Sequence, residues 1–245
     1  MLLFKDEDMH FKLDFSSNSV LIKTMSDYQK RKLKVDNLHL SSNMEYEGDF
    51  DIPIVKPYRG EAPDFLLPYN MAMGCETNHV GIHMYIHDCL FSNLWDKLER
   101  QTLKLARFDL LVGPDYSLYM NRSKAINVMN VYKNRFISAY WQQCGLNVVP
   151  SCSWANVDSF RFCFDGLPTH SIISIGTEAG LNNRFEKKLF IKAVEELFKK
   201  KSPVGLIVYG KDSMNDFLYQ FNVPIYYYPG FVKHLKNICN GKKAM

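Results

Sequence analysis

Ser171-Ile172-Ile173-Ser174-Ile175 and Val204-Gly205-Leu206-Ile207-Val208-Tyr209 are two short apolar runs joined by a helical pattern from about Asn183 to Lys201. Apolar residues recur in that pattern at helical spacing, namely Phe185, Leu189-Phe190, Ala193-Val194 and Leu197-Phe198. A strand, a helix and a second strand in this order predict a βαβ unit with parallel strands.

The same alternation extends outward from this unit to Val80 and to Tyr228. Strands are predicted at 80–87, 109–113, 147–150, 171–175, 204–209 and 224–228, and helices at 94–108, 123–144, 183–201 and 213–221. In the helix that Ser123 caps, Ala125, Met129, Tyr132 and Phe136 mark the predicted buried stripe. The pattern indicates an α/β fold with a mainly parallel sheet. Polar residues at nearly every strand end favour an irregular or incomplete (β/α) barrel-like sheet, and an open doubly wound sheet is the alternative.

Residues 1–70 differ from the rest of the chain. They hold a basic cluster at 27–34 and four prolines, Pro53, Pro57, Pro63 and Pro68. Closely spaced prolines deny the backbone regular ladders. We therefore expect an irregular N-terminal arm over 1–70, which wraps the α/β domain of residues 71–245 or contacts a host protein.

Bulk composition excludes several classes of protein. The chain has 245 residues, 47% of them hydrophobic, which is enough for a large core. The formal net charge of +4 permits a basic patch but does not require nucleic acid as a partner. No apolar run approaches the roughly 20 residues that span a bilayer, and the N-terminus turns acidic too early for a secretory signal. We expect a cytoplasmic protein that does not enter a membrane, and the sequence specifies no cofactor, metal or oligomeric state.

Three carboxylates follow predicted strands, namely Asp88, Asp115 and Glu178. The carboxyl ends of parallel strands meet at one edge of a sheet, so these side chains are expected to converge there. Two carboxylates in a semi-apolar cleft can acquire different pKa values, so that one acts as an acid and the other as a base. We take Asp115 and Glu178 as the candidate catalytic pair, with Asp88 in support. The alternative is that the aspartates cap turns or helices.

Further polar and aromatic residues at the strand ends are candidates for substrate binding: Tyr116, Trp154, Tyr209, Lys211 and Arg184. Aromatic rings there suit stacking on a sugar or a base, or else form the upper layer of the core. Lys124, Lys133 and Arg135 on the helix after Ser123 are candidates for contacts with nucleic acid, and a solvated helix face is the alternative. His83 and His87 match no common zinc spacing, so buried or rim histidines are favoured there.

Several sequence segments, taken in their order along the chain, resemble those of a known family. They are Gly113-Pro114-Asp115-Tyr116-Ser117-Leu118-Tyr119, Tyr132-Lys133-Asn134-Arg135-Phe136, Ala139-Tyr140-Trp141-Gln142, Val149-Pro150, Ser153-Trp154, Phe164-Asp165-Gly166-Leu167-Pro168 and Ile173-Ser174-Ile175-Gly176-Thr177. The family is bacterial, occurs also in phages and other mobile elements, and is catalogued only as a domain of unknown function (number forty-four seventeen). The resemblance covers roughly Gly74 to Gly210. It implies a shared fold and a phage or mobile-element source, and it brings no established activity.

Two functional hypotheses follow from these residues. The first is an enzyme that acts on a nucleotide, nucleic acid or sugar-containing substrate by acid/base hydrolysis or glycosyl transfer at the strand ends. The second is a non-catalytic protein of a phage or mobile element that binds nucleic acid through its basic residues or a host partner through its N-terminal arm.

Overall fold

The computed structural model describes residues 26–75, 80–178 and 181–230, so residues 1–25 of the predicted arm lie outside the described part. The chain divides into two compact units, Met1–Glu45 and Tyr46–Met245. The described part of the smaller unit holds helix α2 (Asp27–Leu33) and the 3-10 helix η3 (Leu38–Leu40). Ser26 and Gln29 form a capping box at the start of α2, so the basic cluster of the sequence is helical.

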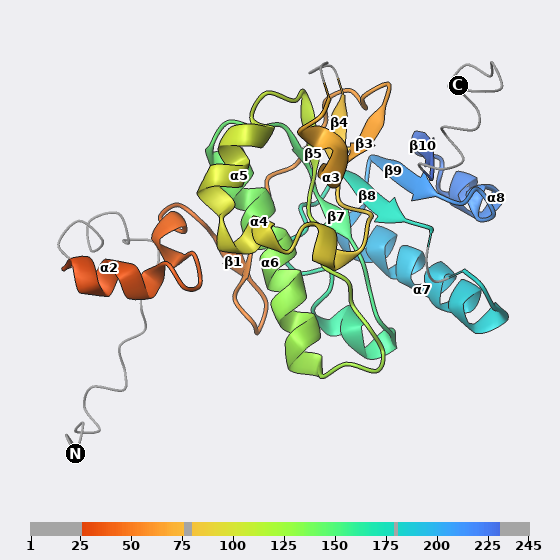
Figure 1. Cartoon of the computed structure of the whole chain (residues 1–245). Coiled ribbons are helices and arrows are strands. Elements are labelled where there is room, and N and C mark those ends of the chain that lie inside the picture. Colours follow the sequence, from red (N-terminus) through yellow and green to blue (C-terminus); the bar gives the residue numbers. More distant parts are fainter. Residues whose placement is uncertain (1–25, 76–79, 179–180, 231–245) are drawn as a thin grey trace, which may run out of the picture. The chain divides into compact units, whose positions relative to one another are not determined.

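The larger unit is built on parallel strands (Figure 1). One four-stranded sheet has the order β3 (Leu66–Pro68), β4 (Gly81–His83), β5 (Leu110–Val112), β6 (Val148–Val149). The other has the order β7 (Ser151–Cys152), β8 (Ile172–Gly176), β9 (Gly205–Gly210), β10 (Ile225–Pro229). Every pairing within these two sheets is parallel, and each strand pairs with the next one in the chain. A short antiparallel pair, β1 (Tyr46–Glu47) and β2 (Ile52–Pro53), precedes them.

Pro150 marks the point where the chain passes from one sheet to the other. On one side Val149 pairs with Val112 of β5, and on the other Ser151 pairs with Ser174 of β8. Proline has no N–H to continue a ladder, but its carbonyl still accepts a hydrogen bond of 2.9 Å from Ser174 N. The strand order is therefore sequential from β3 to β10, as in a barrel, although the described strands do not close into one. The predicted α/β fold with an incomplete barrel-like parallel sheet is confirmed.

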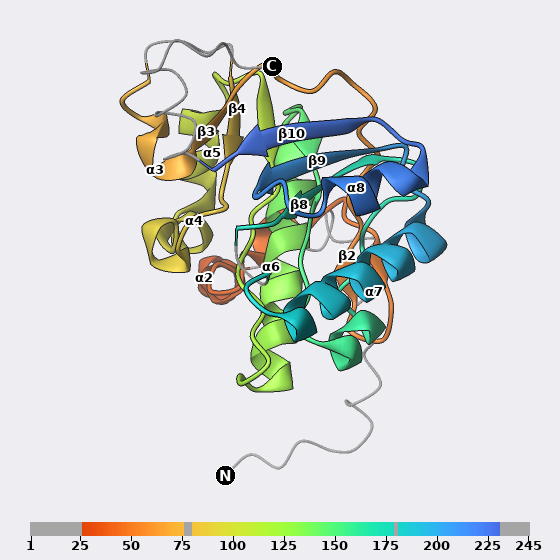
Figure 2. The same ribbon diagram turned by 90° about the vertical axis from the view of Figure 1, so that its right-hand side faces the viewer.

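Alternation along the strands sets two packing faces. Ile173 and Ile175 of β8 pack on α7 (Arg184–Lys201) in an outer core that also holds side chains of α8 (Asn215–Leu218). Figure 2 shows both helices along the sheet of β8, β9 and β10. Their neighbour Ile172 faces an inner core, together with Leu66 of β3 and Val112 of β5. Because this inner core draws on both sheets, the two sheets curve around one interior.

Residues 46–70 belong to the larger unit. Tyr58 O accepts a hydrogen bond of 2.8 Å from Ile172 N, and Tyr58 N donates one of 2.9 Å to Ser171 Oγ. Tyr228 of β10 donates to the carbonyl of Pro63. This segment thus covers the start of β8 and contacts β10, and the division between the compact units falls after Glu45.

The remaining helices cover the sheets. They are α3 (Tyr69–Ala72), α4 (Asn93–Asp96), α5 (Leu98–Leu105) and α6 (Lys124–Gln143), with 3-10 helices η4 (Asp88–Leu90), η5 (Val157–Arg161) and η6 (Tyr219–Phe221). Lys97, with φ −130°, divides the predicted helix at 94–108 into α4 and α5. The predicted buried stripe of α6 is wrong in its first half, because Ala125 and Met129 are exposed while asparagines are buried there. Among the described residues, no helix combines the length and the apolar character needed to cross a membrane.

Candidate functional site

The ends of the parallel strands share one edge, and the Asp115 carboxyl is the central group there. Asp115 follows β5, and its Oδ1 is buried without a hydrogen-bond partner among the described residues. Burial raises the pKa of Asp115 from 3.8 to about 6. A hydrogen bond with Ser153 lowers this pKa, the charge of Asp88 raises it, and the charge of Arg135 lowers it. A carboxyl with such a pKa can both donate and accept a proton near neutral pH.

Asp88 fixes the loop that carries Asp115. The Ser117 hydroxyl donates a hydrogen bond of 2.8 Å to Asp88 Oδ1, and Ser117 N lies 3.2 Å from Asp88 Oδ2. The link joins η4, which follows β4, to the loop after β5. Asp88 therefore has two effects: it positions the loop, and its negative charge disfavours ionisation of Asp115.

Three buried asparagines of α6 hold the same loop from the other side. Asn134 accepts a hydrogen bond of 2.8 Å from Tyr116 N, Asn130 donates one of 2.8 Å to Ser117 O, and Asn127 bonds to both N and O of Tyr119. These asparagines are not among the site residues predicted from the sequence. Their spacing of three and then four residues places amides on one helix face, which is the signal that could have found them.

Arg135 lies in the interior, and not at the surface where a contact to nucleic acid is predicted. Only 2% of the residue is exposed. Its guanidinium donates to three backbone carbonyls, those of Ser151 (2.7 Å), Cys163 (2.9 Å) and Asp165 (3.1 Å). Those bonds hold the end of β7 against the loop at 163–165, so Arg135 does not reach a phosphate outside.

An aromatic group lies beside the strand ends in the inner core. His83 of β4 packs on Tyr209 of β9 with ring centroids 4.0 Å apart, and Tyr85 stacks on Tyr209 at 5.4 Å. His83 Nδ1 accepts a hydrogen bond from Tyr85 N, and burial lowers the pKa of His83 to about 3. The imidazole is therefore neutral and carries its proton on Nε2, which is buried without a partner among the described residues. Tyr209, a candidate rim residue, is in fact part of this buried group.

The Tyr85 hydroxyl connects the two sheets near Asp115. It donates a hydrogen bond of 2.7 Å to Ser174 Oγ of β8. Burial raises the pKa of Tyr85, and the charge of Asp115 raises it further. Tyr85 and Ser153 are thus hydroxyl groups close enough to Asp115 to interact with it.

The other predicted substrate residues serve several roles. Tyr116 is buried and packs on Phe91 with centroids 4.8 Å apart, while the half-buried Trp154 meets Phe190 edge to face at 5.6 Å. Both belong to the core. Lys211 donates to Asn182 at 3.1 Å, and Arg184 is exposed at the first position of α7.

The two remaining basic candidates differ in their surroundings. Lys124 is exposed at the start of α6. Lys133 is half-buried, and its ammonium lies 5.2 Å from the centroid of the Trp95 ring and 5.5 Å from that of Tyr116. Lys133 therefore stabilises local aromatic packing.

Glu178 occupies a different environment from Asp115. It is exposed, and its carboxylate lies against Gly230, where an added Cβ would collide with Oε1. Gly210, with φ +125°, packs on the Glu178 backbone N. The charged groups that act on Asp115 are Asp88 and Arg135, so the structure brings Asp115 together with Asp88. The described residues hold no cluster of three or more histidine, cysteine or carboxylate side chains suited to a metal.

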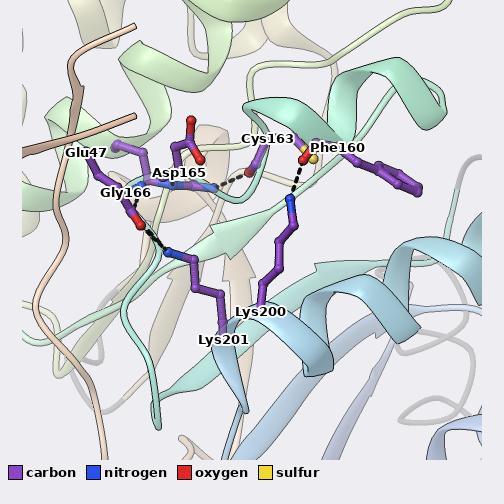
Figure 3. A network of polar contacts seen from close by, with 8 residues as sticks. Glu47, Phe160, Cys163, Asp165, Gly166, Lys200 and Lys201 are labelled. Carbon is purple, nitrogen blue, oxygen red and sulfur yellow. Dashed lines mark hydrogen bonds and ion pairs between the residues drawn. The ribbon is translucent and has the colours of Figure 1, made fainter. Parts of the chain in front are cut away.

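A second polar network ties β1 to the far end of α7 (Figure 3). The Glu47 carboxylate accepts 2.9 Å hydrogen bonds from Lys201 Nζ and one of 2.7 Å from Gly166 N. Gly166 has φ +70°, and an added Cβ would collide with the carbonyl of Pro53. The Asp165-Gly166 turn therefore has a structural role. Its Asp165 carbonyl accepts a hydrogen bond from Arg135, and its Gly166 N donates one to Glu47.

The chain shows clear similarity to known proteins. The model of the family described as Domain of unknown function (DUF4417) matches residues 44–226. "Gene 1 protein" of Mycobacterium phage L5 is 32% identical over 181 residues, which cover 73% of this chain and 79% of that protein. "Gene 1 protein" of Mycobacterium phage D29 is 31% identical over 189 residues, which cover 74% of this chain and 70% of that protein. No solved structure matches at a significant level. The chain belongs to the DUF4417 family, and proteins of phages are among its relatives.

Proposed function

We propose that the protein is an enzyme in which Asp115 transfers a proton to or from its substrate. The observation that carries this proposal is the buried Asp115 carboxyl, whose pKa is raised to about 6 and whose Oδ1 is without a hydrogen-bond partner among the described residues. A buried polar atom left unpaired costs stability, and such costs concentrate at functional sites. Its place at the carboxyl edge of a parallel sheet is where α/β enzymes bind their substrates.

The groups around Asp115 suit a polar substrate. Ser153 and Tyr85 supply hydroxyls, and both interact with the Asp115 carboxyl. Burial raises the pKa of Asp115, the charge of Asp88 adds to this rise, and Asp88 also fixes the loop. Within the proposal, the substrate is a nucleotide, nucleic acid or sugar-containing molecule, and the reaction is hydrolysis or glycosyl transfer. Glu178 is the candidate for a second carboxylate.

The test is a hydrolysis screen of the full chain against nucleotides, single-stranded and duplex nucleic acids, nucleosides and aryl glycosides. Asp115→Asn should reduce turnover by about a hundredfold or more, because general acid/base catalysis contributes that much. The matched control is Asp216→Asn on the exposed side of α8, which should retain activity. An Asp115→Asn variant with full activity would refute the assignment.

A second measurement needs no substrate. Carboxyl carbon NMR of aspartate-labelled protein, with Asp115→Asn to assign the signal, reports the pKa of Asp115 directly. A midpoint near 6 supports the proposal. A midpoint near 4 would remove its basis, since the carboxyl would then be an ordinary ionised group at neutral pH.

A further inference from the structure

A groove lies on the outer layer between η5 and the N-terminal halves of α6 and α7. A cavity of about 340 Å³ is lined by Val157 and Asp158 of η5 and by Phe185, Lys188 and Lys192 of α7. A smaller cavity of about 90 Å³ is lined by Arg122 and Lys124. Both cavities are also lined by Asn156 and Asp158, so they adjoin each other, and we call them together the basic groove.

The basic groove carries most of the excess charge of the protein. Its lining has four cations, Arg122, Lys124, Lys188 and Lys192, and one carboxylate, Asp158, for a net charge of 4 − 1 = +3. The whole chain has a net charge of +4, so everything outside the groove contributes only 4 − 3 = +1. This concentration on one surface favours an anionic partner.

An aromatic ring accompanies these cations. Phe185 is 61% exposed, whereas Leu189 one turn later is buried. Phe185, Lys188 and Lys192 follow the i, i+3, i+7 spacing and so share one face of α7. The carboxylate of the nearby Glu186 accepts a 2.7 Å hydrogen bond from Asn182 N.

We propose that the basic groove binds single-stranded nucleic acid. Lys188, Lys192, Arg122 and Lys124 contact successive phosphates, and an unpaired base stacks on Phe185. The exposed ring of Phe185 favours a single strand over an acidic peptide or a nucleic-acid duplex. An acidic peptide would use the cations alone, and a duplex would keep its base faces covered. This binding is independent of proton transfer by Asp115.

The experiment is fluorescence anisotropy of the full chain with a labelled oligothymidylate of about 20 nucleotides, at several salt concentrations. Lys188→Glu/Lys192→Glu should weaken binding at least tenfold and should reduce the log–log salt slope by about 1.4, because each lost phosphate contact contributes about 0.7. The matched control is Arg100→Glu/Lys104→Glu, which makes the same charge change at the same i, i+4 spacing on an exposed face of α5. It should change the affinity less than about twofold.

Phe185→Ala separates stacking from charge. It should weaken binding about tenfold and leave the salt slope unchanged, because it removes a stacked base without removing a cation. Asp115→Asn should bind as well as the wild type, so a failure of the catalytic proposal leaves this one standing.

Four results would overturn the proposal. They are no binding at low salt, equal weakening by the α5 control, tighter binding of poly-glutamate than of the oligonucleotide, and equal affinity for duplex with no effect of Phe185→Ala. The third result would assign the groove to an acidic protein partner.

Discussion

Asp115 and Glu178 each follow a strand of a parallel sheet, Asp115 in one sheet and Glu178 in the other, yet Asp115 is enclosed and Glu178 is exposed. Around Asp115, Asp88 of η4 accepts a hydrogen bond from Ser117 in the loop after β5, the asparagines of α6 hold the same loop, and Arg135 of α6 donates to the backbone of β7. Around Glu178, the carboxylate rests against glycines. Position at a strand end therefore does not set the chemistry of a carboxylate. What sets it is the number of neighbouring segments that shield it from water.

The largest expected loss of stability comes from a substitution in the enclosed region around Asp115. Arg135→Met should lower the free energy of unfolding by about 4 kcal/mol, because it leaves three buried carbonyls without their charged donor. Urea denaturation measures it. On the exposed side, Lys211→Met removes one surface hydrogen bond and should cost less than about 0.5 kcal/mol. Similar losses for the two variants would break the comparison.

The next effect depends on pH. The native state holds a proton on Asp115 up to about pH 6, whereas the unfolded chain releases it near 3.8. Between these values the native state binds more protons, so its stability falls as pH rises, by about 3 kcal/mol for two pKa units. Asp115→Asn removes this contribution. Denaturation of both proteins from pH 4 to pH 7 should therefore show the variant gaining about 2–3 kcal/mol over the wild type as pH rises, and parallel curves would contradict the raised pKa.

Substitutions at Gly113 and Gly230 should show a smaller difference in stability between the two regions. An added Cβ at Gly113 would lie 2.5 Å from Ser138 Oγ and 3.1 Å from Ser151 N, inside the enclosed region. Gly113→Ala should cost about 1–3 kcal/mol by overpacking. At Gly230 the added methyl meets the tip of the exposed Glu178 side chain, which can rotate away, so Gly230→Ala should cost less than about 0.5 kcal/mol. Thermal unfolding of the pair checks the order, and the reverse order would show that the Glu178 side is the rigid one.

The smallest effect is expected for Glu178→Gln. Because Glu178 is exposed, the substitution should change the free energy of unfolding by less than about 0.5 kcal/mol. Chemical denaturation at pH 7 measures this. A loss above about 1 kcal/mol would mean that Glu178 has structural partners comparable to those of Asp115.

The unit β8–α7–β9 could be predicted because its local signals agree. Apolar residues alternate along the strands, recur at helical spacing in the helix, and Asn183 caps the helix by accepting a hydrogen bond from Glu186 N. Strands β3 and β7 could not be predicted in this way. Each is short and adjoins or contains a proline, and their pairing depends on neighbours distant in sequence.

The location of the candidate site could be predicted from the sequence, but the hydrogen-bond partners of its residues could not. Asp88 and Asp115 do converge at the strand edge, as parallel topology requires. The burial of Arg135 and of the asparagines of α6 could not be seen in advance, since polar residues become core residues only when a distant backbone supplies their hydrogen bonds. The same fact explains why the predicted stripe through Met129 was wrong.

The contacts of residues 46–62 have a consequence for biosynthesis. Lys56, Tyr58 and Glu47 leave the ribosome early, but their partners Gln142, Ser171 and Lys201 lie 86, 113 and 154 residues later in the chain. During synthesis each strand finds its neighbour soon after it emerges, while the contacts of this first segment form later and in stages, the Glu47 contact only once Lys201 has been made. A nascent chain arrested before Lys201 would carry β3 to β8 without β9 and β10, and Glu47 would lack its lysine partner, a state in which proteases or chaperones would find it.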